Sequence, residues 1–132
     1  MSTFLLEIVT PERLIYSEQA DSLVVRGLEG ELGILPGHVP FVTPLQIAPV
    51  TIKANGKEQR IAVAGGFVEV RKEKVVILAE SAELANEIDI DRARAAKERA
   101  ETRLSSNRDQ YDHRRAELAL QKAMNRLKVS GQ

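Results

Sequence analysis

The distribution of proline and glycine divides this chain into two parts. All five prolines and seven of the eight glycines lie before residue 67, and residues 89–132 contain no proline. Proline interrupts helices, and clusters of glycine and proline mark turns between short elements. We therefore predict a turn-rich β-domain over residues 1–84, a linker over 85–88 and a helical segment over 89–132.

The charge changes sign at the same boundary, although the whole chain is neutral. Residues 1–88 carry 8 basic and 12 acidic side chains, whereas residues 89–132 carry 11 basic and 7 acidic ones. A basic segment of this kind is suited to an acidic protein surface. We expect no nucleic-acid partner, because phosphate-binding helices usually show a cleaner basic stripe and Tyr111 is the only aromatic residue here.

The composition argues against several classes of site. Without cysteine there is no disulfide, thiol nucleophile or thiolate metal site. The two histidines, His38 and His113, are far apart, and His38 has no catalytic partner nearby in sequence, so we expect no catalytic residue and no metal. We also expect no membrane span and no export signal, because neither the required apolar run nor a basic leader is present. A place in the cytosol, or on a membrane-bound partner, fits these features.

The first part shows strand signals every eight to twelve residues. Phe4, Leu6 and Ile8 alternate with outward positions, and the segment VTIKANGKEQRIAV predicts a hairpin with a type I′ turn at Asn55-Gly56. The segment FVEVRKEKVVILAE predicts a second hairpin that turns at Lys72-Glu73. This spacing is typical of an antiparallel β-sandwich or flattened barrel.

The pair Gly65-Gly66 has two interpretations. It could form a phosphate-binding loop, but the Lys-Ser/Thr pair and the helix of such a loop do not follow it. A bulge or strand corner is therefore the favoured interpretation.

The second part predicts a two-helix antiparallel hairpin. Asp89 and Asp91 stand where carboxylates favour a helix N-terminus, and the segment SSNRD at 105–109 predicts the turn. Apolar residues recur every three to four positions in each helix: Ala93, Ala96, Ala100 and Leu104, then Ala116, Leu120, Ala123 and Leu127. Alanine buries little area, so the hairpin should be only marginally stable. It is either a moving part or a permanently docked one.

Three motifs in order along the chain carry a family resemblance: GELGILPGHVPFVTPL, AVAGGFVEV and RRAELALQKAMNRL. With a sandwich followed by a helical hairpin, the whole chain resembles the epsilon subunits of rotary proton-translocating ATP synthases, most closely those of Bacillus-type bacteria. The resemblance implies a non-catalytic central-stalk subunit that binds the gamma subunit and the c-subunit ring, at the cytoplasmic side of the cell membrane.

The resemblance also implies a regulatory role for the hairpin. In the family it folds down beside the sandwich or extends along gamma towards the catalytic alpha and beta subunits, where it inhibits ATP hydrolysis. We expect Arg114, Arg115 and Arg126 to make this contact, because its target is acidic. Two alternatives remain open, a freestanding ATP-sensing module and a structural adaptor.

A nucleotide site is implied by the motif Ile88-Asp89-Ile90-Asp91-Arg92-Ala93, which matches epsilon subunits that bind ATP. In those proteins the isoleucine and aspartate hold adenine, and arginines of both helices hold phosphates. The matching residues here are Glu83, Ile88, Asp89, Arg92, Arg99, Lys122 and Arg126. The expected ligand is ATP, with or without magnesium. A solvated basic helix face is the alternative interpretation.

Lys122 is a departure from the family pattern. It stands where the strongest ATP binders carry arginine, and lysine lacks the bidentate guanidinium fork. The resemblance therefore allows a weaker affinity for ATP.

Overall fold

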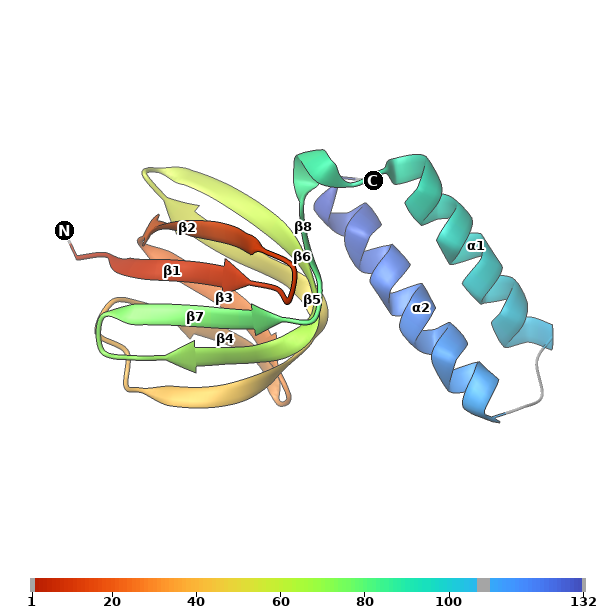
Figure 1. The fold of residues 1–132 in the computed structure, drawn as a ribbon, viewed down its shortest axis with the longest axis horizontal. Coiled ribbons are helices and arrows are strands. Elements are labelled where there is room, and N and C mark those ends of the chain that lie inside the picture. The colour runs from red at the N-terminus through yellow and green to blue at the C-terminus, as the bar shows by residue number, and fades with distance from the viewer. Residues whose placement is uncertain (1, 107–109, 132) are drawn as a thin grey trace.

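The computed structural model describes residues 2–106 and 110–131. The chain forms strands first and helices afterwards (Figure 1). The elements are β1 (Phe4–Val9), β2 (Leu14–Ala20), β3 (Ser22–Gly27), β4 (Gly30–Ile34), β5 (Phe41–Ala54), β6 (Lys57–Val70), β7 (Lys74–Ala79), β8 (Ala82–Leu84), the 3-10 turn η1 (Ala85–Glu87), α1 (Ile90–Ser106) and α2 (Gln110–Val129).

The strands form one sheet in the order β2-β1-β7-β6-β5-β3-β4, and β8 pairs with β6 beside this path. The strands enclose a single core, so the predicted sandwich is confirmed. One pair departs from the expected antiparallel pattern: β1 and β7 run parallel, with Leu6 opposite Val75. Strands that are far apart in sequence meet here, and a local alternation of side chains contains no information about that pairing.

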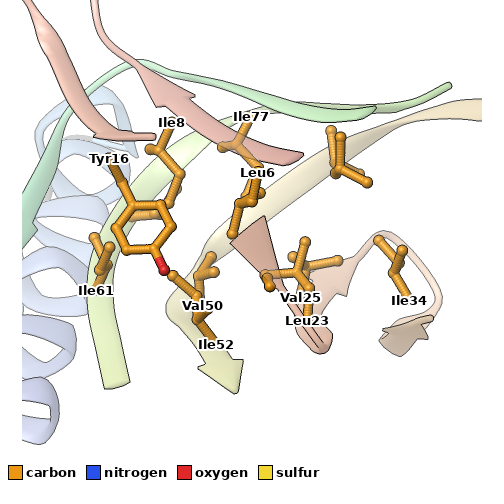
Figure 2. Close-up of a cluster of buried hydrophobic side chains, with 14 of the residues drawn as sticks. Leu6, Ile8, Tyr16, Leu23, Val25, Ile34, Val50, Ile52, Ile61 and Ile77 are labelled. Atoms are coloured by element: carbon orange, nitrogen blue, oxygen red, sulfur yellow. The ribbon is translucent and has the colours of Figure 1, made fainter. Parts of the chain in front are cut away.

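The core follows the alternation seen in the sequence. Phe4, Leu6 and Ile8 point inward from β1, while the residues between them are half-buried. Figure 2 shows Leu6 and Ile8 beside Ile77 of β7, above side chains from β3 and β5. All residues of this core lie between Phe4 and Leu84, so the sandwich has a core that does not need the helices.

The two predicted hairpins are present. Asn55 and Gly56 have φ angles of 53° and 74° between β5 and β6, as a type I′ turn requires. The second hairpin joins β6 to β7, with Val70 opposite Val75.

The pair Gly65-Gly66 forms a strand corner, as the favoured interpretation had it. Before this point β6 pairs with β8, and after it with β7. Gly66 has φ of +122°, and a Cβ atom there would lie 2.1 Å from the Leu78 carbonyl oxygen. Only glycine allows the two backbones to approach this closely.

The helical hairpin lies against one end of the sandwich (Figure 1). α2 contacts β5 and β6, and α1 packs on α2 away from the sheet. The buried residues of the stripes are Ala93, Ala100, Ala116, Ala123 and Leu127. α1 continues to Ser106, and the rest of the predicted turn, 107–109, lies outside the described residues. Among those described, neither helix is both long and apolar enough to cross a membrane.

We predict that Gly66→Ala destabilises the sandwich severely, because the added methyl group meets rigid backbone and the φ angle is strained. The expected loss is roughly 2–5 kcal/mol of unfolding free energy, measured by denaturant titration. Gly33→Ala is the matched control in β4. A Cβ atom there meets nothing within 4 Å, so this variant should differ little from the parent. Equal stability of the two variants would contradict the close approach at Gly66.

Candidate functional site

A groove of about 570 Å³ lies where the sandwich, the linker and the two helices meet. This volume is in the range of small-molecule sites. Its charged lining comes from four separate places in the chain. These residues are Glu12 and Arg13 from the β1–β2 turn, Glu83 and Glu87 from β8 and η1, Asp89, Arg92 and Arg99 from the N-cap, the start and the middle of α1, and Arg126 from α2.

Asp89 fixes the start of α1. Its Oδ1 accepts a hydrogen bond from the Arg92 N–H at 3.1 Å, and its carbonyl oxygen accepts one from the Ala93 N–H at 3.0 Å. Aspartate is a favoured N-cap for this reason. Since Arg92 and Arg99 are seven residues apart, they share one helix face, and both line the groove.

Two ion pairs join the parts of the chain around the groove. The Arg126 guanidinium of α2 pairs with the Glu83 carboxylate of β8, and each side chain is about one-third exposed. The Arg13 guanidinium pairs with the Glu87 carboxylate at 2.8 Å. The hydrogen bond from Arg13, followed by one from the Leu84 N–H, holds the pKa of Glu87 below its usual value. Glu87 therefore carries its charge at neutral pH.

The remaining two arginines of the groove carry no such pair. Arg92 and Arg99 form no ion pair with any residue in 2–106 or 110–131, and both are exposed. Two uncompensated cations on one helix face, in a groove that also holds Arg13 and Arg126, form a suitable environment for a polyanion. Four carboxylates also line the groove, so its charged side chains balance overall and the positive charge is local to Arg92 and Arg99.

The groove brings together five of the seven residues predicted for a nucleotide site: Glu83, Asp89, Arg92, Arg99 and Arg126. Ile88 does not line it. Its side chain is 8% exposed and packs with Ala62 and Val129. Lys122 lies outside the groove, in a hollow of about 10 Å³ that it shares with Glu83 and Arg126.

The residues predicted for contact with catalytic subunits are not together. Arg114 and Arg115 are exposed near the start of α2, while Arg126 lies near its other end and pairs with Glu83. Arg126 therefore already has a carboxylate partner within the docked arrangement.

Sequence reasoning did not find Arg13 and Glu87. A single arginine in a turn shows no pattern, and only the fold brings it to a glutamate 74 residues later. It also did not find Asn125, a buried residue of α2 whose Nδ2 donates to the Val63 carbonyl oxygen at 3.1 Å. Within the described part of the chain, its Oδ1 is buried with no hydrogen-bond partner.

Comparison with known families accounts for nearly the whole chain. Residues 3–85 match the β-sandwich domain of the ATP synthase delta/epsilon chain, and residues 86–131 match the long alpha-helix domain of the same family. The chain belongs to the ATP synthase epsilon-chain family.

Individual members of this family are similar over their full length. The chain is 58% identical to the ATP synthase epsilon chain of Brevibacillus brevis over 131 residues, covering 98% of this chain and 99% of the relative. It is 56% identical to that of Alkalihalophilus pseudofirmus over 132 residues, covering 99% of each. These matches agree with the Bacillus-type resemblance.

A solved structure shows a related fold. A chain of the Euglena gracilis mitochondrial ATP synthase, in a structure of its OSCP/F1/c-ring assembly, superposes with a TM-score of 0.84 at 26% identity. The match covers 98% of this chain and 82% of the Euglena chain.

We predict that Arg13→Gln raises the pKa of Glu87 towards the ordinary glutamate value of about 4.3, as measured by NMR titration of the carboxyl group. The ion pair also makes the stability of the folded chain depend on pH. A depressed folded-state pKa contributes stability above the unfolded-state pKa, and this contribution is lost as the pH falls through the folded-state pKa. The parent should therefore lose this contribution on acidification, and the variant should lack it. An unchanged Glu87 titration would show that the ion pair does not form in solution.

Proposed function

We propose that this chain is a non-catalytic rotor subunit in the central stalk of an ATP synthase. Its partners would be the gamma subunit, the c-subunit ring and the catalytic alpha and beta subunits, on the cytoplasmic side of the membrane. Support comes from the full-length similarity to bacterial ATP synthase epsilon chains. The Euglena relative, seen within an F1/c-ring assembly, supports the same role.

We further propose that the hairpin inhibits ATP hydrolysis when it leaves the sandwich. The polar part of the docked contact is small, which supports this role. α2 packs on β5 and β6, with an apolar cluster of Ala62, Ile88 and Val129, one hydrogen bond from Asn125, and the pair of Arg126 with Glu83. Partly exposed ion pairs contribute about 0–1 kcal/mol. Release would remove the Glu83 partner of Arg126, and basic residues near both ends of α2 would then be available to an acidic partner.

We propose ATP, with or without magnesium, as the ligand of the groove. The observation that carries this proposal is the position of Arg92 and Arg99, which line a groove between sandwich and hairpin without an ion pair from the described residues. Phosphates would bind there and at Arg126, and adenine would lie by Asp89. Ile88, packed on Ala62 and Val129, would position Asp89. Lys122, in the adjacent hollow with Glu83 and Arg126, would add positive charge near the phosphates without contacting them.

ATP would then favour the docked, non-inhibitory state. A ligand that binds only one conformation stabilises it by RT ln(1 + [L]/Kd), about 2.7 kcal/mol at a hundredfold excess over Kd. This is enough to shift a balanced equilibrium about a hundredfold.

We expect the isolated protein to bind ATP, as measured by calorimetry. Arg92→Ala should weaken binding about tenfold because phosphate charge loses a partner, and Asp89→Ala should weaken it by removing an adenine hydrogen bond. Arg103→Ala is the control, since Arg103 lies on the same helix but does not line the groove. No ATP binding at millimolar concentration, or equal affinity in all three variants, would refute the site.

We expect a chain ending at Glu87 to assemble with gamma and to support ATP synthesis, while ATP hydrolysis by the reconstituted complex rises. The sandwich core lies wholly between residues 4 and 84, so removal of the helices leaves it intact. Far-ultraviolet circular dichroism of the truncated chain provides the folding control. A correctly folded truncated chain that fails to assemble would contradict this division of roles.

A further inference from the structure

Arg13 differs from the other cations of the groove in its origin. Arg92, Arg99 and Arg126 belong to the hairpin, whereas Arg13 is contributed by the sandwich, in the turn between β1 and β2. Its backbone is held firmly, because the Thr10 N–H donates to the Arg13 carbonyl oxygen at 2.9 Å and the Thr10 hydroxyl oxygen accepts from the Arg13 N–H at 3.2 Å. Thr10 itself is 6% exposed.

The side chain of Arg13 is less constrained than its backbone. It is 54% exposed, and its partner Glu87 is 34% exposed. A pair this exposed contributes little, since water and salt screen both charges. A stronger anion in the groove could therefore replace the Glu87 carboxylate at small cost.

We propose that Arg13 is a phosphate-binding residue of the groove, which pairs with Glu87 in the empty site and with a nucleoside triphosphate when one is bound. This inference rests on the proposed ATP site and adds a residue to it. The guanidinium offers a bidentate fork that suits phosphate oxygens as well as carboxylates.

Because Arg13 belongs to the sandwich, a phosphate contact with it would make nucleotide binding depend on the docked state. A nucleotide held only by hairpin residues could remain bound when the hairpin leaves the sandwich, and it would then favour neither state. A nucleotide held by Arg13 and by Arg92 and Arg99 together bridges the two parts of the chain. Such a ligand binds the docked state selectively, and differential affinity is what allows a ligand to shift a conformational equilibrium.

Glu87 then acts as an internal competitor for Arg13. Its pKa is held low by Arg13, so it is ionised at neutral pH and repels phosphate as well as occupying the guanidinium. The two members of the pair should therefore have opposite effects on ATP affinity. If the pair merely held the linker in place, loss of either member would weaken binding in the same direction.

The test is an ATP titration of the full chain by calorimetry, with four variants. Arg13→Gln should weaken ATP binding roughly three- to tenfold. Glu87→Gln should tighten it roughly two- to fivefold, since glutamine keeps the oxygen that accepts from the Leu84 N–H but loses the charge. In the double variant Arg13→Gln/Glu87→Gln, removal of the Glu87 charge should raise ATP affinity little, because there is no Arg13 left to release. AMP should be affected less than ATP by Arg13→Gln, because it offers fewer phosphate oxygens.

Arg71→Gln is the matched control. Arg71 forms an ion pair with Glu69 of the same length, 2.8 Å, with side-chain exposures of 56% and 34%, but neither residue lines the groove. This variant should leave ATP affinity unchanged. Unchanged ATP affinity in Arg13→Gln, or weakening by both Arg13→Gln and Glu87→Gln, would overturn the role of Arg13. It would leave the proposed ATP site standing. Failure of the parent chain to bind ATP would overturn the proposed site and this inference together.

Discussion

The contact between α2 and the end of the sandwich is the interaction on which the arrangement of this protein depends. It includes Asn125, whose Nδ2 bonds to the Val63 carbonyl oxygen while its Oδ1 is buried without a described partner. The hydrogen bond from Nδ2 crosses from the hairpin to the sheet and therefore sets where α2 docks. The sandwich does not depend on this contact, because its core is complete without the helices.

The ion pairs around the groove also set the geometry of the docked state more than its stability. Glu83 with Arg126, and Glu87 with Arg13, connect segments that are distant in sequence, and all four side chains are partly exposed. Such pairs define geometry more than they add stability. They line the same groove as Arg92 and Arg99. The docked state therefore brings arginines of the sandwich and of the hairpin to one site, which the separated parts would not form.

Parts of the fold could be predicted from local patterns. The alternation of Phe4, Leu6 and Ile8 and the Asn55-Gly56 turn depend on side-chain period and on backbone φ, and both properties are local. The parallel pairing of β1 with β7 was not predicted, since register between distant strands depends on the whole sheet. At the groove, the motif around Asp89 indicated the helix start and the positions of Arg92 and Arg99. It could not show that Ile88 packs inward on Ala62 and Val129.

The sequence by itself determined the two-part division, through the loss of proline after residue 49 and the change of charge near residue 88, because helix and turn preferences act over a few residues. For Gly65-Gly66 it favoured a strand corner, but the close approach of Gly66 to the Leu78 carbonyl oxygen is visible only in the folded sheet. The tertiary structure alone decided which charges meet. Arg13 and Glu87 are 74 residues apart, and neither has a local pattern that predicts the pair. Their contact exists because the β1–β2 turn and the linker lie at the same end of the sandwich, where the helices begin.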